Sequence, residues 1–296
     1  MKIHNRAEEK TLVKQMWRAR LVLGVARVVR AKWVTHLIDR YCYFSKDRSQ
    51  RLQVVSPYHK NLLMHLDVHS WVERKILCAG YFERWVDEFL SSSLKPGYVA
   101  IDVGANSGCH TLVMAGAVGA SGRVLAFEPN PRMLERLRAN MSLNRIEHVT
   151  VLPMAVSDMP GQLKLFIPAR TDYNQGLGSV HRANLEDSCD EVTVQTTTLD
   201  EQVEIHQLQR LDLIKIDVEG HELHVFKGAE KTLRKFKPIL VFEFSERQWR
   251  NAGVMPHDVE SFLHDLGYEL FVMRRGVTTR IEQGVPEECD LLALPK

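Results

Sequence analysis

The sequence predicts a doubly wound α/β fold, in which helices cover both faces of a mostly parallel sheet. Short apolar runs alternate with helical stretches along residues 98–294, as parallel strands and crossover helices do. The runs "LDLIKID" (211–217) and "PILVFEF" (238–244) are almost continuously apolar, which is typical of strands buried on both faces. A small-residue loop at 104–108 follows the first strand, where such folds bind their ligands.

The elements follow from these patterns in order. We predict strands near 98–103, 123–128, 149–153, 212–217, 238–244, 268–274 and 289–294, and helices near 108–118, 130–143, 220–235 and 256–266. Residues 7–40 and 62–93 are expected to be helical, and the Pro96-Gly97 break ends the second region. Between 161 and 199, "QLKLFIP" and "EVTVQTTTL" predict two antiparallel strands joined by a long loop, and loops of this length are usually functional.

Length and composition limit the alternatives. The 296 residues suit one large α/β domain with an appendage. The five cysteines are scattered, which argues against a disulfide framework or a zinc knuckle and favours a reducing cytoplasm. The sequence shows no apolar run long enough to span a membrane and no signal-peptide pattern.

Charge is unevenly distributed along the chain. Residues 1–60 contain 14 Lys and Arg but only 4 Asp and Glu, whereas the whole chain has a net charge of +2. A basic head predicts an acidic partner, such as an anionic membrane surface, a phosphorylated substrate or nucleic acid. A helical cap or a homo-oligomer contact is the alternative. We therefore expect a cytoplasmic protein, with peripheral contact at the inner membrane face left open.

The loop after the first strand predicts the ligand. Its pattern is Asp102-x-Gly104-x-Asn106-x-Gly108, whereas the dinucleotide fingerprint would need glycine at positions 106 and 109. A carboxylate here can face the ammonium group of S-adenosylmethionine, and backbone groups at the helix start can meet its carboxylate. Glu128, at the end of the second strand, suits ribose hydroxyls. Dinucleotide-binding enzymes also have such an acidic residue. The sequence of the loop, and not Glu128, therefore distinguishes S-adenosylmethionine from a dinucleotide as the expected ligand.

Several segments together resemble a known family. They are "KPGYVAIDVGANSGCHTLVMAGAVGASGRVLAFEPNPRMLERLRANMSLN", "LPMAVSDMPGQLKL", "TTTLDE" and "LDLIKIDVEGHELHVFKGAEKTLRKFKPILVFEF", and they closely resemble the FkbM family of S-adenosylmethionine-dependent methyltransferases. The resemblance covers about residues 66–294. It implies a class I methyltransferase (Rossmann-like) domain at 66–296, with a seven-stranded sheet whose last strand is antiparallel. Residues 1–65 would be a basic, helical N-terminal extension. The family implies O-methylation of a hydroxyl on a sugar, glycolipid or secondary metabolite.

The same resemblance implies cofactor contacts. The methionine moiety would lie against Asp102, Gly104, Asn106 and Gly108, and the ribose against Glu128. The turn "AVSD" would flank the adenine through Ala155 and Ser157. The stretch "CAGYFERW" resembles a family segment whose Tyr81 and Glu83 either close over the cofactor or pack structurally.

The fourth strand carries the catalytic candidates. The segment "DLIKIDVEGHE" delivers Lys215, Asp217, Glu219 and His221 to the carboxyl edge of the sheet. Asp217 either borders the cofactor and acceptor or forms a structural ion pair with Lys215. An alcohol acceptor is a poor nucleophile until a base takes its proton, and Asp217, Glu219 and His221 are the candidates for that base.

Three other features have assignments of their own. Glu243 positions the acceptor or pairs with Lys215, and His110 contacts substrate or only begins a helix. No metal is expected from His221 and His224, because their spacing is not H-E-x-x-H.

The segment 161–199 is predicted to be an acceptor lid, with hydrogen-bonding candidates Arg170, Asn174, His181 and Arg182. Carboxylate methylation and a non-catalytic cofactor-binding role remain alternatives. Against a nucleic-acid methyltransferase, the fourth strand reads "IDVEG" and lacks the Asn/Asp-Pro-Pro-aromatic motif that holds a flipped base.

Overall fold

The computed structural model describes residues 53–67, 70–169, 176, 178–185, 189–274, 277–281 and 285–296. The chain divides into two compact units, Met1–Phe82 and Glu83–Lys296. This division falls later in the chain than the predicted boundary between residues 65 and 66. The helix predicted at 7–40 lies outside the described residues.

The described part of the first unit is a β-hairpin followed by a helix. Strands β1 (Gln53–Tyr58) and β2 (Leu62–Asp67) pair antiparallel, and α3 (Trp71–Ala79) follows. The helix predicted from residue 62 is therefore wrong at 62–67. The backbone reverses at His59 and Lys60, both of which have positive φ, and this turn sets β2 against the β-branched residues of β1. Helix α3 ends at Gly80, whose φ of 83° suits a left-handed cap.

The second unit is built on one large sheet. Its strand order is β12-β11-β13-β10-β9-β3-β4-β5, and the strands are β3 (Val99–Val103), β4 (Arg123–Phe127), β5 (Val149–Leu152), β9 (Leu213–Ile216), β10 (Ile239–Ser245), β11 (Tyr268–Arg274), β12 (Val277–Arg280) and β13 (Glu288–Pro295). Strand β13 is antiparallel to both β10 and β11. The predicted seven-stranded sheet with an antiparallel last strand is confirmed. The short exposed strand β12 pairs with β11 and adds an eighth strand at the edge.

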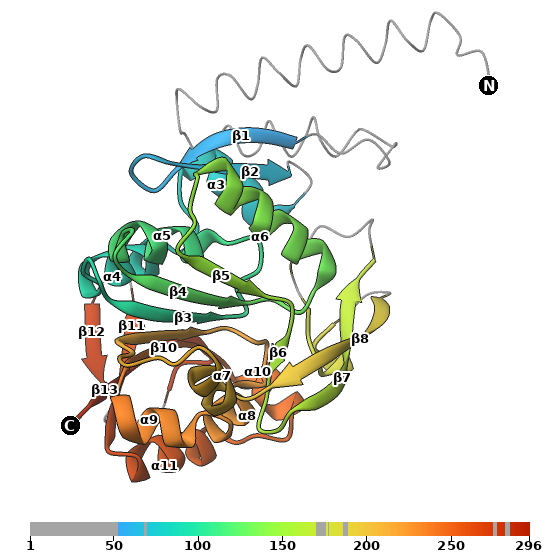
Figure 1. Ribbon diagram of the computed structural model, residues 1–296. Coiled ribbons are helices and arrows are strands. Elements are labelled where there is room, and N and C mark those ends of the chain that lie inside the picture. Colours follow the sequence, from blue (N-terminus) through green and yellow to red (C-terminus); the bar gives the residue numbers. More distant parts are fainter. Residues whose placement is uncertain are drawn as a thin grey trace, which may run out of the picture. The chain divides into compact units, whose positions relative to one another are not determined.

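Helices cover both faces of this sheet (Figure 1). One face carries α4 (Arg84–Ser93), α5 (Cys109–Val118) and α6 (Pro131–Leu143); the other carries α7 (Leu199–Ile205), α8 (Glu222–Lys227), α9 (Glu230–Phe236) and α11 (Pro256–Asp265). Ile101 and Val103 of β3 join the core cluster that includes residues of these last four helices. Alternation along the strand therefore turns Asp102 toward the face of α4 and α5.

The helix predicted at 220–235 is two helices. Gly228 ends α8, and α9 begins at Glu230. A Cβ atom on Gly228 would lie 2.0 Å from the carbonyl oxygen of Ser157. The break therefore lets this part of the chain approach the loop around Ser157 more closely than a side chain would allow.

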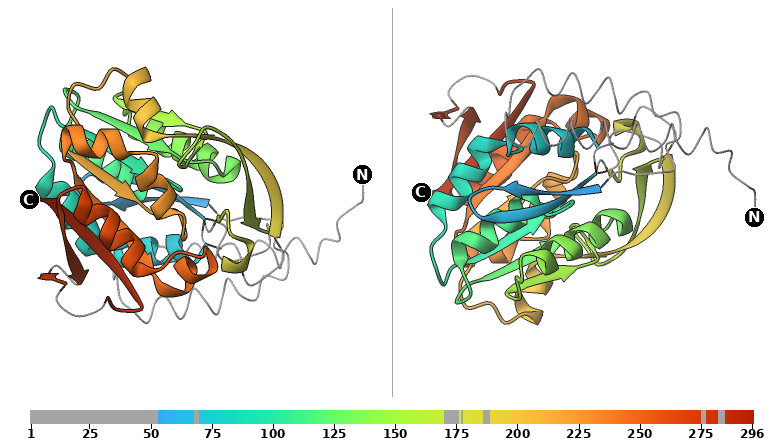
Figure 2. Two further views of the ribbon diagram at one scale, coloured as in Figure 1. Left: turned by 90° about the horizontal axis from the view of Figure 1, so that it is seen from below. Right: turned by 90° about the horizontal axis from the view of Figure 1, so that it is seen from above.

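A second, smaller sheet has the order β6-β8-β7. Its strands are β6 (Ala155–Val156), β7 (Gly161–Pro168) and β8 (Cys189–Thr197), and the short helix η1 (Arg182–Asn184) lies between β7 and β8. The antiparallel pairing of β7 with β8 confirms the prediction for this segment. In both views of Figure 2 these two strands lie at the opposite end of the unit from the C-terminus.

Candidate functional site

The carboxyl ends of β3, β4, β9 and β10 meet at one edge of the sheet, because these strands are parallel neighbours. The loop at 104–108 joins β3 to α5 at this edge. Its backbone turns through positive φ at Gly104 (82°), Asn106 (52°) and Gly108 (96°). The amides of Gly104 and Ala105 both donate to the carbonyl oxygen of Phe127, so the loop is fastened to the end of β4.

Both loop glycines are required by the protein itself. A Cβ on Gly104 would lie 1.8 Å from the carbonyl oxygen of Asp217, and a Cβ on Gly108 would lie 2.6 Å from Leu137. The family resemblance implied only that the methionine moiety of the cofactor lies against both glycines. The structure gives a nearer cause, since strand and helix atoms already fill the space that a side chain would need.

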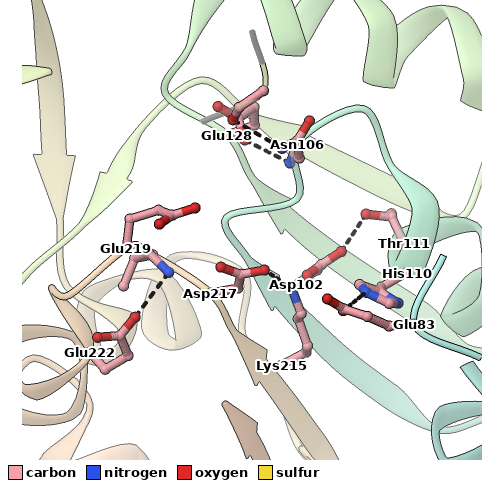
Figure 3. A network of polar contacts seen from close by, with 12 residues as sticks. Glu83, Asp102, Asn106, His110, Thr111, Glu128, Lys215, Asp217, Glu219 and Glu222 are labelled. Carbon is pink, nitrogen blue, oxygen red and sulfur yellow. Dashed lines mark hydrogen bonds and ion pairs between the residues drawn. The ribbon is translucent and has the colours of Figure 1, made fainter. Parts of the chain in front are cut away.

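Glu128 joins the loop to the start of α6. Its carboxylate accepts hydrogen bonds from the backbone amides of Asn106 and Asn130, each at 2.7 Å. Burial raises the pKa of Glu128 to about 7, although both hydrogen bonds favour the charged form. Figure 3 shows Glu128 and Asn106 together at the top of the polar network. Glu128 therefore fastens the loop to the start of α6.

Asp102 is fully buried under the same loop. Thr111 donates a 2.5 Å hydrogen bond to Asp102 Oδ2. Asp102 Oδ1 is buried and has no hydrogen-bond partner among the described residues. In the sheet register Asp102 stands opposite Lys215 of β9, so the two side chains lie on the same face.

Lys215 and Asp217 form a close ion pair, with Nζ 2.8 Å from Asp217 Oδ2. Burial alone would raise the pKa of Asp217, but the Lys215 ammonium outweighs it and lowers that pKa. Burial would likewise lower the pKa of Lys215, yet the carboxylates of Asp217 and Asp102 raise it. The structural ion pair that the sequence analysis considered is present.

Glu219 and Glu243 complete a group of three carboxylates with Asp217. One oxygen from each lies within 4.8 Å of the others, and all three side chains are half-buried. Burial, together with the charges of Asp217 and Glu222, raises the pKa of Glu219 to about 8. Burial and the same neighbouring charges raise the pKa of Glu243 well above its usual value. Glu243 was predicted only to position an acceptor or pair with Lys215; its register puts it beside Asp217.

His110 bridges two acidic residues on the first turns of α4. Its Nδ1 lies 3.0 Å from Asp87 Oδ1, and its Nε2 lies 3.1 Å from Glu83 Oε2. Burial would lower the pKa of His110, but these hydrogen bonds outweigh it and raise the pKa to about 10. His110 is therefore an imidazolium held between two carboxylates, which ties α5 to α4.

His221 lies apart from the carboxylate group. Its Nε2 is 2.9 Å from Ser157 Oγ, and its ring stacks on His224 with centroids 4.2 Å apart. Burial, with the nearby His224 and His181, lowers the pKa of His221 to about 3. His221 is neutral at ordinary pH and a weak base. Its Nδ1 is buried and has no hydrogen-bond partner among the described residues.

The segment between β7 and β8 reaches the site at two points. Asn106 Nδ2 donates to the carbonyl oxygen of Gly176 at 3.0 Å. The carbonyl oxygen of Glu219 accepts hydrogen bonds from Asn184 Nδ2 at 2.6 Å and from Ser179 Oγ at 3.1 Å. Glu219 has a left-handed φ of 55°, so these contacts hold a strained backbone position. Two of the predicted lid residues, Arg170 and Asn174, lie outside the described residues.

Comparison with known proteins identifies the family. The family model described as the methyltransferase FkbM domain matches residues 102–270. The chain belongs to the FkbM methyltransferase family. A second model, protein-L-isoaspartate(D-aspartate) O-methyltransferase, matches residues 19–158, which is less than half of the chain.

Curated relatives of this FkbM family member cover part of its length. The hexuronic acid methyltransferase AglP of Haloferax volcanii is 32% identical over 166 residues, which is 55% of this chain and 60% of AglP. The 2-O-methyltransferase NoeI of Sinorhizobium fredii is 28% identical over 165 residues, 52% of this chain and 66% of NoeI. The chain thus spans about 60% of AglP. A crystal structure of methyltransferase FkbM from Methylobacillus flagellatus aligns at a TM-score of 0.42 with 15% identity, over 74% of this chain and 52% of that chain.

The FkbM resemblance predicted that the loop and the fourth strand form the site. It did not predict three residues that hold His110 and Glu219 in place. Asp87 was overlooked because only packing of α4 against α5 brings it to His110. Asn184 and Ser179 were overlooked because nothing in their local sequence indicates a contact with Glu219. The DVEGHE run suggested that His221 accompanies Asp217, yet the turn through Glu219 and Gly220 sends His221 to Ser157.

Proposed function

We propose that this protein is an S-adenosylmethionine-dependent methyltransferase that methylates a hydroxyl on a sugar, a glycolipid or a secondary metabolite. One observation carries the proposal. The loop at 104–108, with Asp102 and Glu128 beside it, lies at one edge of the sheet. The carboxylates of Asp217, Glu219 and Glu243 lie at the same edge. A ligand-binding loop therefore adjoins groups that can accept a proton. Membership of the FkbM family and the sugar-related names of two relatives support it.

The residues present suit this cofactor. Asp102 Oδ1, buried and unpartnered among the described residues, would meet the ammonium group, and Gly104, Asn106 and Gly108 would lie against the methionine moiety. Glu128 would hold the ribose hydroxyls. Ala155 and Ser157 would flank the adenine, with the unpartnered His221 Nδ1 next to Ser157 as a further acceptor. When bound, the cofactor supplies a methyl group on a positively charged sulfur.

The protein's own part in the reaction is to align the acceptor and remove its proton. An alkoxide-like oxygen attacks far more readily than a neutral hydroxyl, and alignment for in-line displacement supplies much of the remaining acceleration. Of the two carboxylates after β9, we assign the proton acceptor to Glu219, because its raised pKa makes it a stronger base than Asp217, which Lys215 holds in an ion pair. We place His221 at the adenine end, because its hydrogen bond to Ser157 and its lowered pKa make it a poor base.

Cofactor binding tests this proposal through Glu128. Glu128→Gln is expected to weaken binding of S-adenosylhomocysteine at least about tenfold, since hydrogen bonds to a charged group contribute about 1.5–3 kcal/mol. Isothermal titration calorimetry measures both affinities. Glu135→Gln, an exposed residue of α6, is the matched control and should bind like the wild type. Equal affinity in the Glu128 variant, or no binding by the wild type, contradicts the proposal.

A carboxylate acceptor is the second candidate. It is favoured by the partial match to the protein-L-isoaspartate(D-aspartate) O-methyltransferase model, and a carboxylate needs no strong base. The two products differ chemically, because a methyl ester is hydrolysed by mild alkali whereas a methyl ether is stable. Incubating labelled cofactor with extract fractions and then raising the pH separates the two: label that survives alkali supports hydroxyl methylation.

We further propose that residues 161–199 act as an acceptor lid. The contacts of Gly176 with Asn106, and of Asn184 with Glu219, support it. Asn184→Ala is expected to lower the methyl-transfer rate about tenfold while leaving cofactor affinity unchanged, because a buried hydrogen bond that orients Glu219 is lost. Initial rates with labelled cofactor and calorimetry give the two readouts. Gln195→Ala, on the exposed side of β8, is the control, and an unchanged rate in Asn184→Ala would refute the lid.

Other partner assignments stay predictions. No helix in the described part of the chain has the length and apolar character of a membrane-spanning helix. Contact of the basic residues 1–60 with an anionic membrane surface, and formation of a homo-oligomer, remain untested, since residues 1–52 lie outside the described residues.

A further inference from the structure

The carboxylates of Asp217, Glu219 and Glu243 converge at the carboxyl ends of β9 and β10. Asp217 follows Ile216, which pairs with Phe242, so Asp217 and Glu243 stand side by side in the sheet. Glu219 enters from the loop after β9, and one oxygen from each residue lies within 4.8 Å of the other two. Oxygen atoms grouped in this way are the donors that hard divalent cations prefer.

The protein balances the charge of this group only in part. Lys215 Nζ bonds Asp217 Oδ2, Gln248 Nε2 donates a hydrogen bond to Glu219 Oε2, and the charge of His110 also stabilises the ionised form of Asp217. The charges of Asp217 and Glu222 destabilise the ionised form of Glu219, whereas the charge of Arg247 stabilises it. Glu83 and Glu222 add repulsion at Glu243. When all three carboxylates are ionised, the single bonded ammonium leaves two negative charges, which a divalent cation would neutralise.

Two further buried carboxylates lie near that group: Asp102, which would meet the ammonium group of the cofactor, and Glu222, whose charge acts on both Glu219 and Glu243. Asp102 is 0% exposed and Glu222 is 1% exposed, and neither Asp102 Oδ1 nor Glu222 Oε2 has a hydrogen-bond partner among the described residues. Asp102 stands opposite Lys215 in the register, and Figure 3 shows its carboxylate beside that of Asp217 on the same face. Buried carboxylate oxygens are costly unless a donor or a cation satisfies them.

We propose that Asp217, Glu219 and Glu243 bind one divalent cation of the oxygen-preferring class, such as Mg²⁺ or Mn²⁺. The donor set contains no Cys or His, which disfavours zinc. The half-buried position of all three side chains leaves room for water or substrate oxygens to complete the coordination. If the proposed methyltransferase function holds, on which this role rests, the ion would bind adjacent acceptor hydroxyls and favour loss of a proton from one of them.

Direct binding of Mn²⁺ tests the site without requiring activity. Purified full-length protein, freed of metal with EDTA and desalted, is titrated with Mn²⁺ and followed by electron paramagnetic resonance. We expect one tight Mn²⁺ per chain in the wild type and at least about tenfold weaker binding in Glu243→Gln and in Glu219→Gln. Glu230→Gln is the control, because Glu230 pairs with Arg234 on the surface of α9, and it should bind like the wild type.

Folding and cofactor binding are checked on the same samples. Glu243→Gln removes one excess carboxylate, so its thermal midpoint in EDTA should be no lower than that of the wild type. Absence of Mn²⁺ binding at millimolar concentration, or equal binding by wild type and both variants, overturns the metal site. Calorimetry with S-adenosylhomocysteine in EDTA separates the failures: cofactor binding without Mn²⁺ binding refutes only the cation, whereas no cofactor binding under either condition refutes the proposed function.

Discussion

Gly104→Ala is expected to destabilise the protein by at least about 3 kcal/mol, at the upper end of single-residue effects. The added Cβ would lie 1.8 Å from the carbonyl oxygen of Asp217, and this neighbour is backbone that cannot turn away. The positive φ of 82° adds about 1–2 kcal/mol of left-handed strain. Urea unfolding followed by circular dichroism measures the loss, and we expect cofactor binding to disappear with it.

A second glycine separates the clash from the strain. Gly253 also has a positive φ, of 72°, but a Cβ there would meet nothing within 4 Å. Gly253→Ala should therefore cost only the strain, about 1–2 kcal/mol. Equal losses in the two variants would show that close packing of the loop against the end of β9 is unimportant.

His110→Gln is expected to cost about 3 kcal/mol at pH 6, because it removes the buried imidazolium and its hydrogen bonds to the carboxylates of Asp87 and Glu83. The pKa of His110 rises from 6.5 to about 10 on folding. A raised pKa means that the histidine's contribution is complete below pH 6.5 and is lost as pH rises through 10. The difference in unfolding free energy between wild type and variant should therefore shrink between pH 6.5 and 10.

Urea unfolding at pH 6, 8 and 10 measures this difference. His257→Gln is the matched control, since His257 is an exposed residue beside Asp258, and it should follow the wild type at every pH. A wild-type advantage that stays constant across this range would show that His110 is not a buried imidazolium.

Local sequence was sufficient for seven of the eight strands of the main sheet, all except β12. Buried parallel strands need continuous apolar runs, and each predicted run became a strand. The helix predicted at 62–67 was wrong. The sequence "LLMHLD" is compatible with a helix, and only the turn at His59 and Lys60 makes it a strand by pairing it with β1. Local sequence also did not predict that the helix at 220–235 is interrupted at Gly228, because the need for glycine there comes from contact with the distant Ser157.

The candidate site shows the same limit. Asp102, Glu128 and Asp217 follow strands, so their meeting at one edge follows from parallel topology. Glu243 joins Asp217 only through the register of β9 and β10, which no local pattern encodes. His110 meets Asp87, and Asn184 meets Glu219, through tertiary packing between segments 23 and 35 residues apart.

The position of β13 has a consequence for synthesis of the chain. This strand, Glu288–Pro295, is inserted between β10 and β11, although it is made after both. Leu291, Leu292 and Ala293 fill the core there. While the ribosome is still translating the segment after β11, β10 and β11 have no strand between them and expose unpaired backbone edges. We therefore expect the nascent chain to be prone to misassembly until β13 has been added to the sheet.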